Sequence, residues 1–215
     1  MKLSLSLPVT PYHVNQPFGV NYFTYHQFGL DGHNGLDLQA YHGQPVYASH
    51  DGTVTIEVDA HQGHGVVLLS DQQYDYNGSQ CYFKTIYWHL CDPDKEPNYP
   101  YPVKDGQKVK RGDLIGYADN TGFSTGDHLH FGLKPVAIDE PAFLLENIAQ
   151  NNGYLGAIDP TPYLNTTYSV DLPIDPTVPV QPYTPLPLPQ RQDFASPWAY
   201  AHALFYYFRR KFTGK

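Results

Sequence analysis

The stretch that decides the fold is His128-Leu129-His130-Phe131-Gly132-Leu133, a run of apolar, aromatic and histidine residues. Such a run, bounded by turn residues, is typical of a β-strand. Side chains two residues apart on a strand point to the same face, so we expect His128 and His130 to present their imidazoles side by side. Histidines in this arrangement also occur on ordinary protein surfaces, so the pattern alone leaves a functional and a purely structural interpretation open.

The chain around this strand repeats the same pattern. Short apolar runs between turn residues predict further strands at 46–48, 52–58, 65–69, 82–88 and 113–116. Asn77-Gly78 is expected at the tip of a hairpin. The spacing of about ten residues between strands favours an antiparallel sheet or sandwich over βαβ units. One helix is predicted from Pro141 to Asn151, with Pro at its start and Gly153 just beyond its end.

The composition agrees with a mainly β chain. Its 215 residues include 19 Tyr, 11 Phe and 2 Trp, and 16% are charged, which excludes a disordered chain. The 18 Gly and 20 Pro residues form about 18% of the chain, against roughly 12% in average usage, which favours short strands and turns. The net charge of −8 has the wrong sign for tracking a phosphate backbone, so we expect no nucleic-acid partner.

Cysteine content and apolar runs bear on the compartment. Ten extended residues from Cys81 to Cys91 would span roughly 33 Å, so a disulfide would need a chain reversal between them, and two unpaired thiols are expected. The first seven residues alternate polar and apolar and then meet Pro8, so we expect no secretion signal. No run approaches about 18 apolar residues, so no membrane-spanning helix is expected.

The C-terminal part of the sequence changes character. We expect a domain over residues 1–170, a proline-rich spacer over 171–190 and a basic amphipathic helix over 191–215. In the spacer, prolines recur at every third residue from Pro173 to Pro185, as on one face of a polyproline II helix, and an irregular strap lying on the domain surface is the alternative. In the last segment, aromatic residues repeat at helical spacing before a basic end.

Two histidine arrangements carry candidate chemistry. His33 and Asp37 form an H-x-x-x-D pattern in a glycine-flanked loop, and His128 and His130 form an H-x-H pattern. A catalytic zinc takes three His or carboxylate ligands and keeps a fourth position for water. His33, Asp37 and one histidine of the pair supply that set, and the other histidine remains as an acid or base. The sequence has no H-E-x-x-H motif, so histidines would have to move the protons.

Seven motifs in this order resemble one known family. From Asn15 to Leu164 the chain is similar to the lysostaphin and LytM type of zinc endopeptidase, which cleaves peptide cross-bridges or stems of bacterial peptidoglycan. The matching stretches are 16–19, 32–37, 43–48 with 51–54, 87–90, 103–116, 120–131 and 159–164. The resemblance implies a mainly β, antiparallel fold of the lysostaphin-like, duplicated hybrid motif type.

The resemblance also implies roles for five residues. Zinc would be held by His33, Asp37 and His130, with His89 and His128 as an unligated catalytic pair. Zinc lowers the pKa of its bound water towards about 7, and a neutral imidazole can take the proton as the hydroxide attacks the peptide carbonyl. The metal and the second histidine can stabilise the oxyanion and protonate the leaving amine. The sequence does not assign these steps between the two histidines.

Several positions depart from the family pattern or stand outside it. Asp127 and Gly132 flank the H-x-H, at positions where the family often has other residues. The insertion from Cys91 to Tyr101 is expected to form a loop over one rim of the cleft, which sets specificity or is only a long surface loop. His61 and His64 are expected to be solvated in a hairpin turn. The remaining histidines show no partner pattern, namely His13, His26, His42, His50 and His202.

The function hypothesis is a zinc metalloendopeptidase acting on bacterial peptidoglycan. The alternatives are an inactive regulator of another wall enzyme, a peptidoglycan-binding module, and a carrier module of the biotinyl or lipoyl type. Without a secretion signal, a phage lysin or a virion component fits better than a secreted autolysin, and a shortened chain would show the same pattern. Residues 191–215 are expected to dock on a membrane, a wall polymer or protein.

Overall fold

The computed structural model describes residues 1–139 and 144–166. The predicted spacer and C-terminal helix, and with them the domain boundaries, lie outside the described residues. Within these, the chain is mainly β, as predicted. Its strands are β1 (Val14–Gln16), β2 (Leu36–Gln39), β3 (Pro45–Tyr47), β4 (Gly52–Asp59), β5 (Gly63–Ser70), β6 (Tyr74–Tyr76), β7 (Ser79–Leu90), β8 (Lys108–Val109), β9 (Leu114–Tyr117), β10 (His128–Asp139) and β11 (Leu144–Asn147). The described helices are short: α1 (Tyr22–Tyr25) and the 3₁₀ turns η1 (His26–Phe28) and η2 (Thr161–Tyr163).

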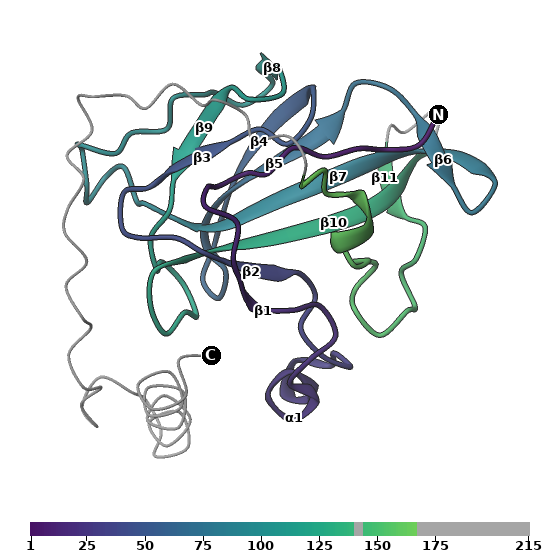
Figure 1. The fold of residues 1–215 in the computed structure, drawn as a ribbon, viewed down its shortest axis with the longest axis horizontal. Coiled ribbons are helices and arrows are strands. Elements are labelled where there is room, and N and C mark those ends of the chain that lie inside the picture. The colour runs from purple at the N-terminus through teal and green to yellow at the C-terminus, as the bar shows by residue number, and fades with distance from the viewer. Residues whose placement is uncertain (140–143, 167–215) are drawn as a thin grey trace. The chain divides into compact units, whose positions relative to one another are not determined.

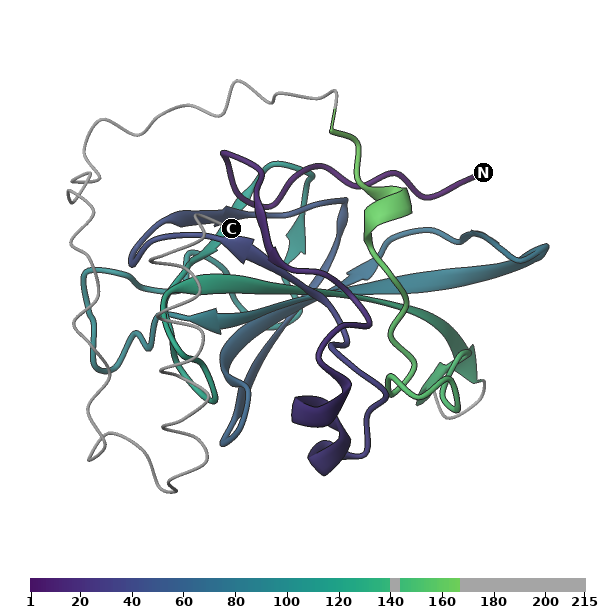
Figure 2. The ribbon, with the colours of Figure 1, turned by 60° about the horizontal axis from the view of Figure 1, so that its bottom comes forward.

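Nine of these strands form one antiparallel sheet built around β7 and β10 (Figure 1). The order is β1-β2-β10-β7-β5-β4-β8, with β11 paired to β10 and β6 paired to β7. One edge of β10 pairs with β2 over residues 128–131 and with β11 over 136–139, and the opposite edge pairs with β7 over 130–136. In Figures 1 and 2 the segment containing α1 lies beside β1, at the edge of the sheet.

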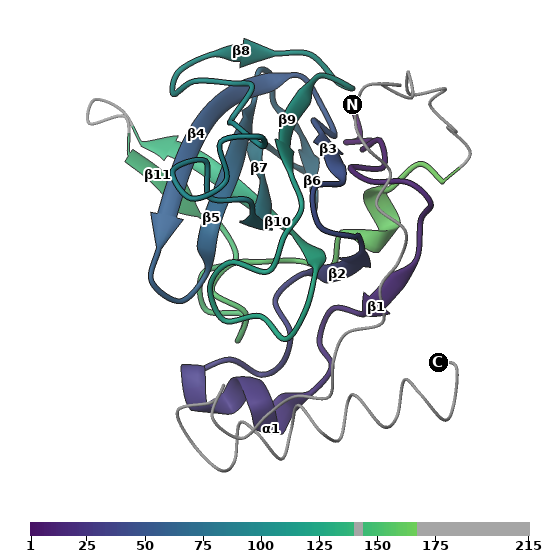
Figure 3. The same cartoon turned by 90° about the vertical axis from the view of Figure 1, so that its left-hand side faces the viewer.

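The core lies between the large sheet, the β3–β9 pair and the N-terminal segment. Leu129, Phe131 and Leu133 alternate with the histidines on β10 and are completely buried. They share one cluster with Val46 and Ile115 of β3 and β9, which lie against the sheet in Figure 3, and with Leu5 of the N-terminal segment. Full burial of a side chain of this size contributes about 1.5–3 kcal/mol, so packing fixes the register of β10. The strand pattern of β10 thereby decides which face carries its histidines.

The sheet brings the candidate residues to one end of three neighbouring strands. His130 is paired with Asp37 of β2 on one side and with Trp88 of β7 on the other. His89 follows Trp88 directly, and His128 lies two residues before His130 on the same face. Residues separated by up to about a hundred positions in the sequence therefore meet at one end of the sheet.

Two local predictions are confirmed. Asn77 and Gly78 both have positive φ, 53° and 84°, as a two-residue hairpin turn requires, and they join β6 to β7. Cys81 and Cys91 are both free and buried. Among the described residues, no helix has the length and apolar character needed to cross a membrane.

The predicted helix from Pro141 to Asn151 is wrong. Leu144–Asn147 instead form β11, paired antiparallel with residues 136–139 of β10. β10 extends six residues beyond Leu133, where the strand was predicted to end. β2 pairs only with residues 128–131 of β10, so it does not cover the edge of this extension. Pairing the exposed edge satisfies backbone hydrogen-bonding groups, and this outweighs the local helix signals.

Candidate active site

Three side chains form a triangle of metal-ligating atoms. His33 Nε2 lies 2.9 Å from His130 Nδ1 and 3.0 Å from Asp37 Oδ1, and His130 Nδ1 lies 3.1 Å from the same oxygen. Ligand atoms placed about 2.0–2.1 Å from a tetrahedral zinc lie roughly 3.3 Å apart, so this set needs only small shifts to hold such an ion. The structure thus brings together the three predicted ligands.

The rings of the triangle are held by the surrounding backbone. His33 donates its Nδ1–H to the carbonyl of Pro17 at 3.1 Å, which leaves Nε2 as the free acceptor, the arrangement that fixes metal-binding histidines. Gly35 packs against His130, and a Cβ there would lie 2.7 Å from the Cε1 and Nε2 of that ring. Asp37 lies on β2 rather than in the predicted glycine-flanked loop, so its position is set by the sheet.

Burial and hydrogen bonding favour an ionised Asp37 and a neutral His130. Burial acts to raise the pKa of Asp37, but the positive charge of His128 and the hydrogen bonds that His128 and His130 donate hold that pKa well below its usual range. Burial lowers the pKa of His130, which favours a neutral ring. A carboxylate beside neutral imidazoles is the state that a metal ion requires.

His89 is aimed at the triangle by a β-bulge. His64 of β5 pairs with Leu90 and Gly65 pairs with Trp88, so His89 is the extra residue on β7. Its φ of 64° is left-handed, a conformation that non-glycine residues adopt at a cost of roughly 1–2 kcal/mol. The strain turns its ring towards His128 and His130, with centroid distances of 4.7 Å and 6.0 Å.

Both catalytic candidates direct Nδ1 to a backbone carbonyl. His89 Nδ1 lies 2.7 Å from the oxygen of Thr121, and His128 Nδ1 lies 2.7 Å from the oxygen of Gly126. Each carbonyl can only accept, so each Nδ1 carries the proton and each Nε2 is left for chemistry. His128 Nε2 lies 3.5 Å from Asp37 Oδ1.

The two rings differ in basicity. Burial, with the positive charge of His128 and His130, lowers the pKa of His89 to about 3. Burial also acts to lower the pKa of His128, but the charge and hydrogen bond of Asp37 raise it above the ordinary value. One imidazole is therefore neutral over a wide pH range, while the other readily carries a proton.

Sequence reasoning missed the groups that orient these histidines. Three of these groups are the backbone carbonyls of Pro17, Thr121 and Gly126. Every residue has a backbone carbonyl, so the sequence does not indicate which ones orient a histidine. Thr121 also uses its hydroxyl, which donates to the carbonyl of Leu90 at 2.7 Å and accepts the backbone N–H of His64 at 3.1 Å. The Asn120-Thr121-Gly122 stretch was the available signal for this anchoring position.

An aromatic contact at the surface joins two segments beside these residues. Phe28 of η1 and Phe123 of the 120–127 loop are both exposed and meet edge-to-face at 5.7 Å between ring centroids. The loop that supplies the carbonyls for His89 and His128 is thereby in contact with the segment that precedes His33.

One prediction for the other histidines is wrong, and two further histidines have partners that the sequence does not indicate. His64 is half-buried and pairs with Asp92 at 3.4 Å, although His61 is exposed as predicted. His42 pairs with two carboxylates. His50 is completely buried, with its ring nitrogens 2.9 Å from the Asp51 carbonyl and 2.8 Å from Thr85 Oγ1. These partners are distant in sequence or belong to the backbone, so spacing does not reveal them.

The predicted loop from Cys91 to Tyr101 contains no described strand or helix. Two ion pairs connect it to the rest of the fold, one between Asp92 and His64 and one between Glu96 and His42. Asp127 lies close enough to His42 and Asp119 for their charges to affect its pKa, while Gly132 faces Ile86 on β7. A role of this loop in specificity stays a prediction.

Comparison with known proteins gives a consistent result. The chain is 38% identical over 102 residues to the peptidoglycan DD-endopeptidase ShyA of Vibrio cholerae, covering 47% of this chain and 20% of that protein. It is 38% identical over 103 residues to an uncharacterized metalloprotease of Haemophilus influenzae, covering 46% of this chain and 18% of that protein. The matched region thus spans about a fifth of the length of these relatives.

Solved structures were also found. A zinc-containing peptidase from Vibrio cholerae has 27% identity and a TM-score of 0.49, covering 74% of this chain and 39% of that chain. Lysostaphin from Staphylococcus simulans has 23% identity and a TM-score of 0.48, covering 78% and 56%.

Residues 31–140 match the sequence profile of Peptidase family M23. This region contains the metal-ligating triangle, the bulged His89 and the whole of the H-x-H pattern. The match confirms the resemblance inferred from the seven motifs. The chain belongs to peptidase family M23.

Proposed function

We propose that this chain is a zinc-dependent endopeptidase that hydrolyses peptide bonds in the cross-bridges or stem peptides of bacterial peptidoglycan. The observation that carries the proposal is the triangle of His33, Asp37 and His130 with two further histidines, His89 and His128, whose Nδ1 atoms are fixed by carbonyls. Relatives named peptidoglycan DD-endopeptidases support the substrate class. The bacterial cell wall is accordingly the proposed place of action.

In this proposal, His33 Nε2, Asp37 Oδ1 and His130 Nδ1 hold the metal ion. One carboxylate and two neutral imidazoles form the donor set of a catalytic zinc site that leaves a fourth position open. Bound zinc would supply a water of lowered pKa and would polarise the scissile carbonyl. The Pro17 carbonyl, through its bond to His33 Nδ1, sets the direction from which that ligand approaches.

His89 and His128 have different roles in the reaction. His89 is the proton acceptor, because its Nδ1–H bond to the carbonyl of Thr121 leaves the Nε2 lone pair available. His128 stabilises the transition state, because its raised pKa favours a protonated Nε2 that can donate a hydrogen bond to the negative charge developing on the carbonyl oxygen. The proton taken up by His89 is then passed to the leaving amine.

An inactive regulator or binding module is not favoured. Such a role does not require a complete donor set or a strained residue aimed at it, and both are present among the described residues. Strained backbone at a site of this kind is expected where geometry serves a reaction.

The proposal is tested by digesting purified peptidoglycan with the zinc-loaded chain and identifying the products by mass spectrometry. We expect fragments with new amino and carboxyl termini within the peptide part, which also identifies the bond cleaved. The Asp37→Ala chain should bind less zinc and release no such fragments. Wild-type-like cleavage by this variant, or cleavage of glycosidic bonds alone, would overturn the proposal.

A further inference from the structure

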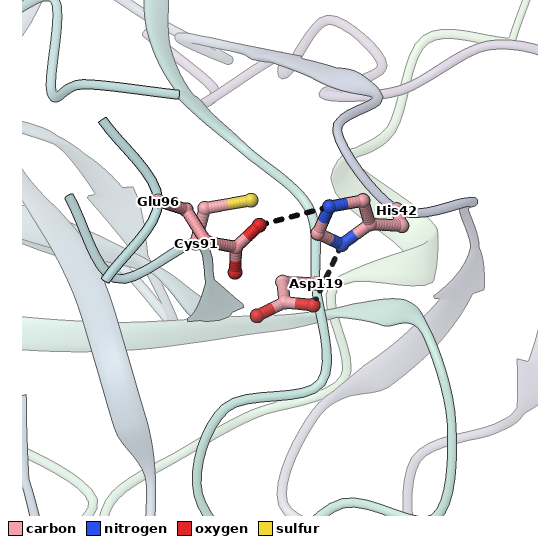
Figure 4. Close-up of side chains that lie close together, drawn as sticks. All are labelled: His42, Cys91, Glu96 and Asp119. Atoms are coloured by element: carbon pink, nitrogen blue, oxygen red, sulfur yellow. Dashed lines mark hydrogen bonds and ion pairs between the residues drawn. The ribbon is translucent and has the colours of Figure 1, made fainter. Parts of the chain in front are cut away.

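A second group of metal-ligating side chains lies outside the site described above. It consists of His42, Cys91, Glu96 and Asp119, which we call the thiol cluster, and one donor atom from each lies within 4.8 Å of all the others (Figure 4). The four residues come from three separate parts of the sequence. None of them belongs to the triangle, to the H-x-H pattern or to the bulge.

The imidazole of His42 lies at the centre of the thiol cluster. Its Nε2 is 2.9 Å from Glu96 Oε2, and its Nδ1 is 2.9 Å from Asp119 Oδ1. Figure 4 shows the thiol of Cys91 on the same side of the ring as Glu96, with Asp119 on the other side. On this side of the ring, the nitrogen of His42, a carboxylate oxygen of Glu96 and the sulfur of Cys91 therefore lie together.

The thiol cluster carries an excess of negative charge. Two carboxylates share one imidazole, and the neighbouring Asp127 adds a further acidic group that is close enough to interact with His42. Burial and the charge of Asp119 raise the pKa of Glu96, and burial with the same carboxylates raises the pKa of the Cys91 thiol. A divalent cation would offset this excess of negative charge and release the thiol proton.

Burial and access also fit a metal ion. Cys91 is 2% exposed, and its Sγ lies 3.5 Å from the backbone carbonyl of Ala118. The side chains of His42 and Glu96 are 41% and 30% exposed, which leaves a path from solvent. Thiolate and imidazole are donors that zinc prefers, whereas calcium and magnesium take oxygen ligands.

We propose that the thiol cluster is a second metal site, which binds one Zn²⁺ ion through Cys91 Sγ, His42 Nε2 and the carboxylate of Glu96. Glu96 moves from the ring nitrogen to the ion, His42 Nε2 and the Cys91 thiol each lose one proton to water, and Asp119 keeps its bond to His42 Nδ1–H. That last bond is the carboxylate–histidine–metal arrangement that orients a ligand ring. A water molecule completes the four-coordinate site.

Such an ion would stabilise the end of the sheet that carries His89 and His128. The backbone N–H of Asp119 donates to the carbonyl of His89 at 2.8 Å, and its carbonyl accepts the N–H of His128 at 3.2 Å. Glu96 belongs to the 91–101 loop. The ion would therefore join that loop to the backbone that carries both catalytic histidines.

Cobalt is a sharp probe of the proposal, because only a thiolate ligand gives a near-ultraviolet sulfur-to-cobalt charge-transfer band and the triangle contains no sulfur. The full chain, kept reduced and freed of metal, is titrated with Co²⁺. We expect two equivalents to bind and the thiolate band to grow with one of them. Saturation with cobalt without the thiolate band would overturn the proposal.

Matched variants assign the band. Cys91→Ser should lose the band and one equivalent, while Cys81→Ser, which removes the other buried free thiol, should keep both. If Cys91→Ser does not fold, His42→Gln serves instead, since its side chain is partly exposed, and it should weaken the band-forming equivalent by at least about tenfold. A band that survives Cys91→Ser, or wild-type affinity in His42→Gln, would contradict the assignment.

The proposal stands apart from the peptidase function. Asp37→Ala should remove the other equivalent of cobalt and leave the thiolate band unchanged. A failed peptidase assay with an intact band would therefore contradict only the proposed function, and an active chain without the band would contradict only the second site.

Discussion

The two histidine clusters use similar donor groups in different settings. In the active-site cluster, His33, His89 and His128 each direct Nδ1 to a backbone carbonyl, with His33 and His89 buried and His128 half-buried. In the thiol cluster, both nitrogens of His42 contact carboxylates and the ring is partly exposed. A carbonyl can only accept a hydrogen bond and carries no net charge, whereas a carboxylate stabilises the imidazolium.

This difference determines what each histidine can do. A ring with a carbonyl at Nδ1 keeps Nε2 available for a metal or a substrate proton. A ring between two carboxylates is held as a cation, and accordingly the pKa of His42 is raised, since the two carboxylates outweigh burial. To bind a metal through Nε2, His42 must lose the proton that it shares with Glu96, whereas His33 already carries its proton on Nδ1.

The largest expected effect comes from removing the two catalytic rings. His89→Ala and His128→Ala should each lower the rate of peptidoglycan cleavage by about 10²- to 10⁴-fold, because general acid–base catalysis and oxyanion stabilisation each contribute about that much. Zinc content should stay at the wild-type level, since neither ring is a ligand in this account. Cleavage rate and metal content are measured on the same preparations.

His61→Ala is the control for this pair, because that histidine is exposed and lies in the hairpin turn between β4 and β5. Its rate should remain at the wild-type level. Loss of zinc in His128→Ala, with zinc retained in His130→Ala, would reverse the proposed roles of the two H-x-H residues.

A smaller effect is expected from crowding one ligand. In Gly35→Ala the new Cβ would lie 2.7 Å from two atoms of the His130 ring and 2.8 Å from the Phe131 carbonyl, so the ring must shift. We expect zinc affinity to fall by about 10- to 100-fold, the range found when the groups that orient a ligand are disturbed. Competition with a chelator of known affinity measures the change.

Gly132→Ala is the matched control on β10. Its Cβ would meet Ile86 Cβ at 3.3 Å and lies away from the metal-ligating atoms. Equal losses of zinc affinity in the two variants would show that general crowding of β10, and not the position of His130, sets the affinity.

The ring nitrogens of His50 bond to a backbone carbonyl and a hydroxyl, so this residue shows how burial changes a histidine pKa without a hydrogen bond to a carboxylate. Burial lowers its pKa, so below the unfolded-state value of about 6.5 the unfolded chain binds a proton that the folded chain does not. Stability from this ring is therefore complete above about pH 6.5 and falls by up to about 1.4 kcal/mol per unit as the pH drops towards the folded-state pKa.

The test compares the wild type with His50→Gln by denaturant unfolding at about pH 7 and about pH 5.5, on either side of the unfolded-state pKa. The variant should lose less stability between the two pH values. His13→Gln, at an exposed position, should follow the wild type. An unchanged pH dependence in His50→Gln would mean that the buried ring accepts its proton without penalty.

The smallest expected effect concerns the contact between the two segments beside the site. Phe123→Ala removes the edge-to-face contact with Phe28, and such pairs contribute about 0.5–1.5 kcal/mol. The free energy of unfolding should fall by that amount. Phe23→Ala, at a ring that is 89% exposed, should change it less, and equal changes would show that the Phe28–Phe123 contact adds nothing.

The parts of the molecule that were predictable from sequence are those encoded by periodicity or by fixed spacing. Alternation on β10 indicated the strand and the shared face of His128 and His130, the H-x-x-x-D spacing indicated His33 and Asp37, and the family resemblance added His89. β11 was missed because its pairing with an open strand edge is a tertiary effect that local signals do not report. Residues joined across the fold were missed for the same reason, as His42 and Asp119 show.

The central claim is that His33, Asp37 and His130 bind zinc while His89 and His128 remain unligated. A crystal structure of the zinc-loaded chain, with diffraction recorded on both sides of the zinc absorption edge, tests it directly. We predict an anomalous peak at about 2.0–2.2 Å from His33 Nε2, Asp37 Oδ1 and His130 Nδ1, with Nε2 of His89 and His128 unbonded to it. Absence of a peak at this triangle, or a zinc ion bonded to His89 or His128, would contradict the account.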